Sequence, residues 1–274
     1  MPELPEVETI VRDLRPTLLE RSIIRAELSH TDVLRGVSRP ALLRGLAGTT
    51  IREVFRRAKH AVFDLGARRL VVQPGMTGSL LVFDRPLTGD EAKYAVLRAT
   101  LDDGRLLVYR DVRRIGTLLW LDAKGWDRYD AAIGPEPLDD AFTPAALHRA
   151  VGRTRQAIKK GLMDQRLLAG VGNIYANEAL YASRIDPSRA ANRLSAEEYG
   201  TLHEALVRIL RAAVAHQGTT LRDYRTGTGD LGHFQFELLA YGREGEPCVR
   251  CGTRLAGTHA IDARITVFCH RCQV

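Results

Sequence analysis

The sequence has no apolar run long enough to cross a membrane. A transmembrane helix needs about 20 consecutive apolar residues, and every apolar stretch of this 274-residue chain is interrupted well before that length. The first ten residues, MPELPEVETI, are acidic and predict a helix. A secretion signal would instead begin with basic residues followed by an apolar segment. Both absences argue against membrane insertion or export and predict a cytoplasmic protein.

Cysteine is absent from the first 247 residues, and the four cysteines present follow the pattern Cys248-x2-Cys251-x17-Cys269-x2-Cys272. In a cytoplasmic protein this clustering indicates metal ligation rather than a disulfide framework. Each pair puts two thiolates on one tight turn, and two pairs complete a tetrahedral Zn²⁺ site without an open position. We therefore expect one structural zinc ion that takes no part in chemistry.

The segment between the two cysteine pairs predicts a zinc-ribbon hairpin. The apolar residues Ile265–Phe268 are typical of a strand leading into the second pair. Arg254, His259 and Arg264 would project from this hairpin and could bring positive charge to DNA. Zinc ribbons also occur in protein-binding modules, so the ribbon alone does not indicate an enzyme.

Acidic residues are outnumbered by basic ones. The 33 Asp and Glu face 40 Lys and Arg, which gives a net charge of +7 and a pI near 9.5. Such an excess favours a polyanionic partner, because Lys and Arg that neutralise phosphates release condensed counterions. The same balance fits a basic, merely solvated surface equally well.

The sequence has no internal repeat and no low-complexity tract, and its length allows two different domains. Val7, Ile10, Val11 and Leu14 recur at helical spacing and predict a leading helix that ends at Pro16. Short apolar runs with turn signals between them then predict a β-sandwich or barrel. These runs are Ile51–Phe55, Ala61–Leu65, Leu70–Val72, Leu80–Phe83, Val96–Leu101 and Leu106–Tyr109. Asp103-Gly104 predicts a hairpin closed by a primed turn, which requires positive φ.

Helical periodicity dominates after the segment 133–138, which we interpret as a linker following an N-terminal domain of residues 1–132. We expect a helical DNA-binding domain at 139–235 and a zinc finger at 236–274. Thr143-Pro144 and the capping box Ser195–Glu198 predict two helix starts. The turn Leu168–Asn173 separates predicted helices at 156–165 and 174–182, an arrangement common both in DNA binding and in ordinary helix packing.

The N-terminus carries a second group of reactive residues. Removal of Met1 would leave Pro2 with a free secondary amine. An α-amino group titrates near ~7.7–8.0, so part of it is neutral at pH 7 and can attack a sugar carbon to form a Schiff base. Glu3 and Glu6 are candidate proton donors beside it. Taken alone, these residues fit a plain helix start better, because proline and acids favour first helical turns.

Motifs along the whole chain change that balance. PELPEVET, RRAKH around Lys59, GMTGSL, Asp111–Arg114, LMDQRLLAGVGNIYANE, YGREGEPCVRCGT and the closing cysteines follow one another. From Pro2 to Gln273 the chain resembles the formamidopyrimidine-DNA glycosylases, bacterial enzymes that remove oxidised purines. The resemblance implies an α+β multidomain fold: an N-terminal β-sandwich with a leading helix, a helix–two-turn–helix domain and a C-terminal zinc-ribbon finger.

The resemblance also implies catalytic roles. Pro2 corresponds to the nucleophile that displaces the damaged base and holds the sugar as an imine. Glu3 corresponds to the acid that protonates the ribose ring oxygen, and Glu6 to a second, supporting acid. Lys59 corresponds to a lysine that acts in the elimination following base removal and that also contacts phosphate. Arg264 corresponds to an arginine that grips phosphates beside the lesion and is linked to the second elimination.

The implied activity is that of a bifunctional glycosylase and abasic-site lyase. It would excise 8-oxoguanine and formamidopyrimidines and cleave the strand by β,δ-elimination, leaving a one-nucleotide gap. The implied partner is double-stranded DNA with oxidised bases or abasic sites, bound by a monomer close to the nucleoid.

Extruding a base from the stack costs a few kcal/mol, so side chains must fill the hole. Met76 and Arg113 correspond to inserted residues, and Arg113 suits the orphaned cytosine. Ile115 stands where the family usually has a phenylalanine wedge; isoleucine can wedge but cannot stack like a ring. Gln73 replaces a common histidine, so one phosphate contact is neutral or lost. Met76 and Ile115 would also fit as buried strand residues.

Further backbone contacts follow from the same resemblance. Asn173, at a turn–helix junction, suits phosphate binding. Tyr224–His233, with three glycines, resembles a mobile loop that closes over the extruded base. The remaining expected DNA contacts are Lys93 and Arg155, whereas Lys159 and Lys160 fit a solvated helix face equally well.

Two alternatives stay open. Endonuclease VIII, the sister glycosylase for oxidised pyrimidines, differs from this chain in the PELPE, RRAKH and GMTGSL segments, and excision preference on defined lesions would distinguish it. A non-catalytic DNA or RNA binder on the same scaffold would fit the departures at Ile115 and Gln73. Retention of Pro2, Glu3, Lys59 and Arg264 argues against such a binder.

Overall fold

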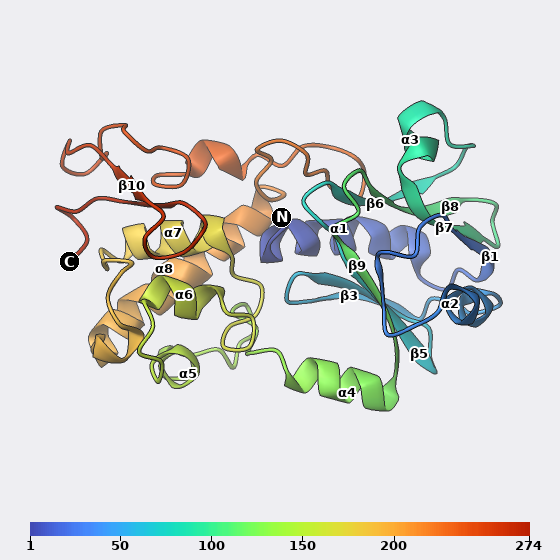
Figure 1. The fold of residues 1–274 in the computed structure, drawn as a ribbon, viewed down its shortest axis with the longest axis horizontal. Helices are drawn as coiled ribbons and strands as arrows, with labels where there is room; N and C mark the ends of the chain where they lie inside the picture. The colour runs from blue at the N-terminus through green and yellow to red at the C-terminus, as the bar shows by residue number, and fades with distance from the viewer. The chain divides into compact units, whose positions relative to one another are not determined.

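A computed structural model describes all 274 residues of the chain. The chain forms two compact units (Figure 1): one of Met1–Asp130 with His216–His233, the other of Ala131–Ala215 with Phe234–Val274. The chain passes to the second unit close to the predicted linker at 133–138. Residues 216–233 of the predicted helical segment belong to the first unit instead. The predicted boundary between 235 and 236 stays a prediction. No helix has both the length and the apolar composition that crossing a bilayer requires.

The first unit contains two β-sheets, as the spacing of apolar runs predicts. A four-stranded antiparallel sheet has the order β1-β7-β8-β6, and a five-stranded sheet has the order β2-β9-β5-β4-β3, antiparallel except for β2 and β9. The strands are β1 (Ile23–Leu28), β2 (Leu34–Arg35), β3 (Glu53–Arg57), β4 (His60–Asp64), β5 (Arg68–Gln73), β6 (Gly78–Phe83), β7 (Ala95–Leu101), β8 (Leu106–Asp111) and β9 (Thr117–Asp122). Three short helices accompany them, α2 (Arg39–Leu46), α3 (Gly89–Lys93) and α4 (Ala123–Ala131).

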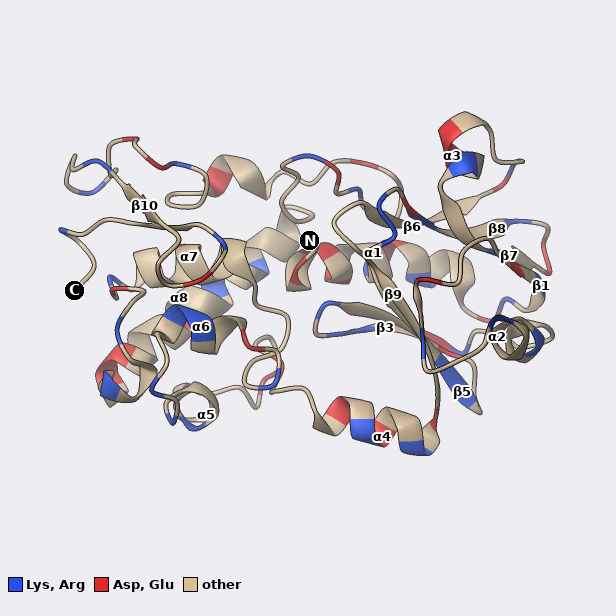
Figure 2. Ribbon diagram, viewed as in Figure 1, with Lys and Arg blue, Asp and Glu red and all other residues tan.

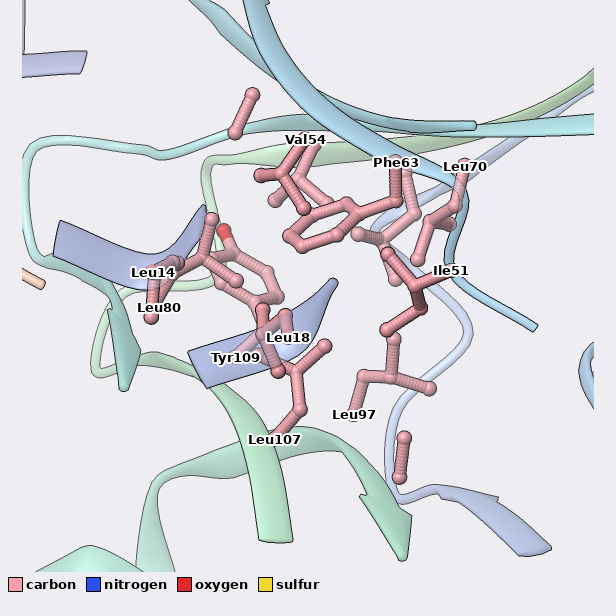
Figure 3. Packing of buried hydrophobic residues seen from close by; sticks show 14 of the residues in the cluster. Leu14, Leu18, Ile51, Val54, Phe63, Leu70, Leu80, Leu97, Leu107 and Tyr109 are labelled. Atoms are coloured by element: carbon pink, nitrogen blue, oxygen red, sulfur yellow. The ribbon is translucent and has the colours of Figure 1, made fainter. Parts of the chain in front are cut away.

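The leading helix α1 (Leu4–Leu18) contributes to the same core as both sheets. Leu14 and Leu18 pack among side chains from strands of the two sheets (Figure 3). The prediction that Pro16 ends the helix is wrong, because α1 continues through it to Leu18. Proline removes one backbone hydrogen bond. Leu18, which is fully buried, lies four residues after Leu14 and keeps the last turn against the core.

The predicted hairpin at Asp103-Gly104 is present between β7 and β8, but its turn is not the primed two-residue type. The loop spans three residues: Leu101 N–H donates to the carbonyl of Arg105 at 2.8 Å and Gly104 N–H to that of Leu101 at 3.0 Å. Only Gly104 has positive φ, at 84°. A three-residue loop closed by one left-handed glycine is the next most common hairpin geometry, and its glycine requirement is the same.

The second unit is helical up to its last segment. Its helices are α5 (Pro144–Val151), α6 (Ile158–Met163), α7 (Asn173–Ala182) and α8 (Ala196–Ala215). Thr143 caps α5 by accepting from Ala146 N–H, and Ser195 and Glu198 form the predicted capping box of α8. The first predicted helix of the helix–turn–helix pair is shorter than expected. It begins only at Ile158, because the preceding residue, Ala157, forms a β-bridge.

Truncation of a core residue of α1 should destabilise the first unit. For Leu14→Ala we expect a loss of about 2–5 kcal/mol in unfolding free energy, since the cavity adds to the lost transfer energy. Both tryptophans, Trp120 and Trp126, lie in this unit, so urea denaturation followed by tryptophan emission reports on it. Arg12→Ala on the exposed side of α1 is the matched control and should change stability by less than about 0.5 kcal/mol. A loss below that for Leu14→Ala would contradict the packing.

Candidate active site and metal centre

The start of α1 buries two carboxylates. Glu3 is the N-cap and Glu6 is the third helical residue, with exposed fractions of 4% and 2%. They form a reciprocal capping box: Glu3 N–H donates to Glu6 Oε2 at 2.8 Å, and the Glu3 carboxylate accepts from Glu6 N–H. Pro2, directly before them, is also buried. Figure 2 shows the acidic start of α1 and the basic strand β3 in the same unit.

Glu6 also binds a segment more than 200 residues away in the sequence. Its Oε1 accepts from Thr219 N–H at 2.8 Å, and its carbonyl accepts from the Tyr224 hydroxyl at 3.2 Å. Gly218 has φ of 82°, and a Cβ there would lie 2.9 Å from Oε1. The carboxylate therefore joins the chain start to residues 216–233. No local sequence signal could have shown this contact.

Burial lowers the pKa of the chain-terminal amine on Met1. Glu3 and Glu6 act against this shift, while the positive charges of Lys59 and Arg113 add to it. This amine stands one residue before the nitrogen that becomes terminal if Met1 is removed. The lowered pKa gives the Met1 amine a larger neutral fraction at pH 7 than an exposed amine would have.

Lys59 lies in the two-residue turn between β3 and β4 and is 5% exposed. Ala58, the other turn residue, has φ of 51°, a left-handed conformation that is strained for alanine. The carbonyl of Ala58 accepts from Arg56 Nη1 at 3.1 Å, and Arg56 Nε donates to Glu8 of α1 at 2.9 Å. Arg56 in turn keeps the pKa of Glu8 low against the effect of burial. A chain of contacts thus joins α1 to the lysine turn.

The three predicted insertion residues lie on two loops joined by Asp111, which the sequence analysis placed in a motif without giving it a role. Its buried carboxylate accepts from Thr77 Oγ1 at 2.5 Å, Gly116 N–H at 2.9 Å and the Tyr109 hydroxyl at 3.1 Å. Arg113 N–H donates to Thr77 Oγ1 at 3.1 Å.

The apolar residues on the loops are exposed, at 46% for Met76 and 51% for Ile115. The prediction that they could be buried strand residues is therefore wrong.

A polar cavity of about 210 Å³ lies in the first unit between strand residues and the segment 216–233. Three arginines give it a positive lining. Its lining residues are Thr77, Ser79, Arg110, Val112, Arg222, Asp223 and Arg225.

Two of the three glycines in the predicted mobile loop serve close packing in this structure. A Cβ on Gly227 would lie 2.7 Å from Asp13 Cβ, and one on Gly232 would lie 2.3 Å from the carbonyl oxygen of Gly218. Gly227 N–H donates to Asp13 at 3.0 Å, and burial raises the pKa of that carboxyl. The loop is anchored in this conformation, and its mobility stays a prediction.

In the second unit the four predicted cysteines come together. Their sulfurs all lie within 4.8 Å of one another, with Cys251 to Cys269 at 3.5 Å and Cys248 to Cys272 at 4.0 Å. Tetrahedral Zn–S bonds of about 2.3 Å require sulfurs about 3.8 Å apart, so the geometry fits a zinc ion. The predicted ribbon strand is present as β11 (Thr266–Phe268), paired with β10 (Ala256–Thr258).

The ribbon hairpin is held to the helices at the residue after Arg264. The carbonyl of Ile265 accepts from Asn173 Nδ2 and from Lys159 Nζ, both at 3.1 Å, and Lys159 Nζ also donates to Thr266 Oγ1 at 2.7 Å. Lys159 is fully buried, so its interpretation as part of a solvated helix face is wrong, whereas Lys160 is exposed.

Three other predicted contact residues are exposed. Arg264 is exposed, with Nε 3.0 Å from Asp262 Oδ1, and Arg155 is exposed before α6. Lys93 ends α3 with its ammonium 5.0 Å from the centre of the Tyr94 ring. Gln73 differs, since it is half-buried at the end of β5 and its Nε2 donates to Met1 Sδ at 3.8 Å.

Family models cover most of the chain. Residues 1–118 match the formamidopyrimidine-DNA glycosylase N-terminal domain, and residues 133–225 match the formamidopyrimidine-DNA glycosylase H2TH domain. Among similar curated proteins, the formamidopyrimidine-DNA glycosylase of Chloroflexus aggregans is 42% identical, covering 100% of this chain and 99% of its own. That of Xanthomonas axonopodis pv. citri is 44% identical, with full coverage of both.

Solved structures of the same kind share the fold. A mutant of Lactococcus lactis Fpg in complex with DNA containing Fapy-dG superposes with a TM-score of 0.88 at 32% identity, covering 99% of each chain. The MutM (Fpg) protein from Thermus thermophilus gives a TM-score of 0.85 at 38% identity, covering 99% of this chain and 98% of its own. The expected fold class is therefore confirmed.

Metal removal should affect the ribbon and leave the first unit folded. We expect one zinc ion per chain by elemental analysis, lost in Cys269→Ser because a tetrahedral site needs all four thiolates. Chelation should weaken affinity for duplex DNA before tryptophan emission changes, since both tryptophans lie in the other unit. Unchanged affinity of the metal-free protein would refute the expected DNA-binding role of the ribbon.

Proposed function

The chain belongs to the formamidopyrimidine-DNA glycosylase family, and we propose that it excises oxidised purines from duplex DNA and then cleaves the abasic strand. The observation that carries this proposal is the chain start itself, where Pro2, Glu3 and Glu6 are buried together. Burial, together with the positive charge of Lys59, lowers the pKa of the terminal amine on Met1 at this site. A chain-terminal amine beside buried carboxylates and a lysine is the set of groups that imine chemistry on a sugar requires.

In the proposed reaction the neutral nitrogen of Pro2, exposed by removal of Met1, attacks C1′ of the damaged nucleotide. The glycosidic bond breaks and its electron pair leaves with the base, which takes up a proton, while the newly bonded Pro2 nitrogen gives up its own proton. Glu3 protonates the ring oxygen as the bond between that oxygen and C1′ breaks, and the nitrogen lone pair freed by the deprotonation completes the imine as its iminium form. We assign to Glu6 the support of this site, in keeping with its hydrogen bonds to both the chain start and Thr219.

Strand cleavage follows from the imine, which acidifies the proton on C2′. We propose that Lys59 assists removal of that proton, so that the 3′ phosphate leaves with the electrons of its C–O bond. A second elimination removes the proton on C4′ and expels the 5′ phosphate with the electrons of its C–O bond, and Arg264 stabilises the departing charge. Hydrolysis of the imine then regenerates Pro2.

DNA recognition in this proposal divides between two kinds of residue. Met76, Arg113 and Ile115, exposed on loops joined by Asp111, would enter the helix and fill the space of the extruded nucleotide. Asn173 and Arg264, near one ribbon carbonyl, would contact phosphates. Lys93 and Arg155 would add further backbone contacts. The exposed isoleucine keeps an apolar wedge available without ring stacking.

The relatives support the proposed substrate class. Crystal structures of Lactococcus lactis Fpg contain DNA with Fapy-dG and DNA with an abasic site, and one MutM complex contains carbocyclic 8-oxo-G. For this chain we propose the same classes of DNA, bound by a monomer in the cytoplasm, with one zinc ion in the ribbon.

The proposal predicts a covalent adduct. Borohydride reduction during reaction with an 8-oxoguanine duplex should trap the protein on DNA, and mass spectrometry should locate the cross-link on Pro2. A duplex without a lesion is the control. A folded protein that binds the duplex but forms no adduct would favour the non-catalytic binder, and preferential excision of oxidised pyrimidines would favour an endonuclease VIII activity.

Removing the acid should separate binding from chemistry. Glu3→Gln preserves the shape and an oxygen that can still accept from Glu6 N–H, but the amide cannot donate an acidic proton. We expect base release to slow by about 10²–10⁴-fold with duplex affinity changed less than about twofold, measured by single-turnover kinetics and by titration. An equal loss of affinity would show that Glu3 acts only in the fold.

A further inference from the structure

The last turn of α4 contacts both residues that flank the Lys59 turn. Arg57 and His60 are paired across β3 and β4 on either side of Ala58 and Lys59. Arg57 Nε donates to Asp130 Oδ1 at 2.5 Å and its Nη2 to the Asp130 carbonyl at 3.3 Å. His60 Nδ1 and the Tyr129 hydroxyl share a hydrogen bond of 2.5 Å. Two consecutive residues of α4, Tyr129 and Asp130, therefore hydrogen-bond to the two residues that flank the Lys59 turn.

Aromatic packing keeps this helix end in register with the hairpin. Trp126 packs edge-on against Phe55 of β3, with ring centres 5.6 Å apart, and lies 5.3 Å from Tyr129. The guanidinium of Arg69 on β5 lies over the Trp126 ring at 4.8 Å. Such contacts restrict the rotation of α4 that would withdraw Tyr129 from the turn.

The turn needs this support because its backbone is strained. An alanine at φ of 51° persists only where the surroundings hold it. Arg56 and Glu8 hold the turn from the side of α1, through the Ala58 carbonyl. Asp130 and Tyr129 hold its flanking residues from the side of α4. Burial also lowers the pKa of His60 to about 4, so the ring is neutral at pH 7 and adds no positive charge beside Lys59.

We propose that Tyr129 and Asp130 are positioning residues for Lys59. Acting through His60 and Arg57, they fix the direction in which the lysine leaves the hairpin. This inference rests on the proposed function, in which Lys59 acts in strand cleavage and Pro2 in base release. Disturbing the α4 contacts should therefore slow the cleavage step selectively, because misplacing a catalytic group by about 1 Å can cost up to about 10²-fold in rate.

The test uses Tyr129→Phe, which removes only the hydroxyl, and Asp130→Asn, which removes the charge. We expect each variant to cleave a duplex with a preformed abasic site about tenfold more slowly than the unmodified protein. Release of 8-oxoguanine should stay within about twofold in single-turnover measurements. Asp130→Glu should restore most of the cleavage rate. Asp127→Asn, on the exposed side of the same helix, is the matched control and should leave both rates unchanged.

A second readout does not depend on catalysis. Lys59 is almost fully buried, so reductive methylation followed by mass spectrometry should modify it slowly, and faster in Tyr129→Phe and Asp130→Asn. Exposed Lys93 is the internal reference in the same unit. The variants should keep the unfolding free energy of the unmodified protein within about 1 kcal/mol, the net value of one hydrogen bond.

The outcomes separate the two proposals. Unchanged cleavage and unchanged Lys59 methylation in both variants would overturn the positioning role. Equal slowing of base release and cleavage would also overturn it, because the contacts would then serve the whole domain. If the unmodified protein neither releases base nor cleaves abasic DNA, the proposed function fails. The methylation rates would still decide whether α4 holds the lysine turn.

Discussion

The hydrogen bonds of one buried carboxylate, that of Glu6, hold the candidate active site together. One oxygen accepts from the backbone at the chain start and the other from Thr219, so the first residues cannot move independently of the segment 216–233. A buried carboxylate without these donors would cost several kcal/mol of folding free energy. The burial of Glu6 therefore depends on both hydrogen bonds, the one from Glu3 N–H and the one from Thr219 N–H. A terminal amine is normally the most mobile group in a chain. Here the Glu6 carboxylate holds the backbone two residues after that amine, and burial lowers the pKa of the amine.

The same helix sets the position of the lysine. Glu8 lies two residues after Glu6 and reaches Arg56, whose guanidinium also holds the Ala58 carbonyl. The first helical turn of α1, up to Glu8, and the side chain of Arg56 therefore set the distance between the chain start and the β3–β4 turn that carries Lys59. This explains why α1 is packed into the core of both sheets, with fully buried residues along its length. Any slip of the helix would displace the amine and the lysine together.

Local patterns predicted much of this architecture. The apolar runs located six strands, the cap residues located α5 and α8, and the cysteine spacing predicted the ribbon. Contacts between distant segments left no such signal. Nothing in the sequence around Asp111 indicates that its carboxylate accepts three hydrogen bonds. The sequence around Lys159 fits a surface lysine on a basic helix equally well, although the side chain is buried. At Pro16 the local signal was present but gave a wrong helix end. The helix continues to Leu18 because burial of Leu18 outweighs the hydrogen bond that proline removes. The roles of Pro2 and Lys59 came from family motifs rather than from periodicity.

A zinc ion held by the four cysteines would contribute geometry to the proposed site rather than chemistry. Arg264 is exposed and precedes a carbonyl that Asn173 and Lys159 both hold, at the start of a strand that ends in Cys269. The ribbon is thus held at the arginine end by two helix residues, and a zinc ion bound by the four sulfurs would fix it at the cysteine end. A buried lysine is costly unless its donors are satisfied, and here the two acceptors, Ile265 and Thr266, both belong to the ribbon. Losing the ribbon would remove both of these acceptors from the buried ammonium, so zinc binding and helix packing should stabilise each other.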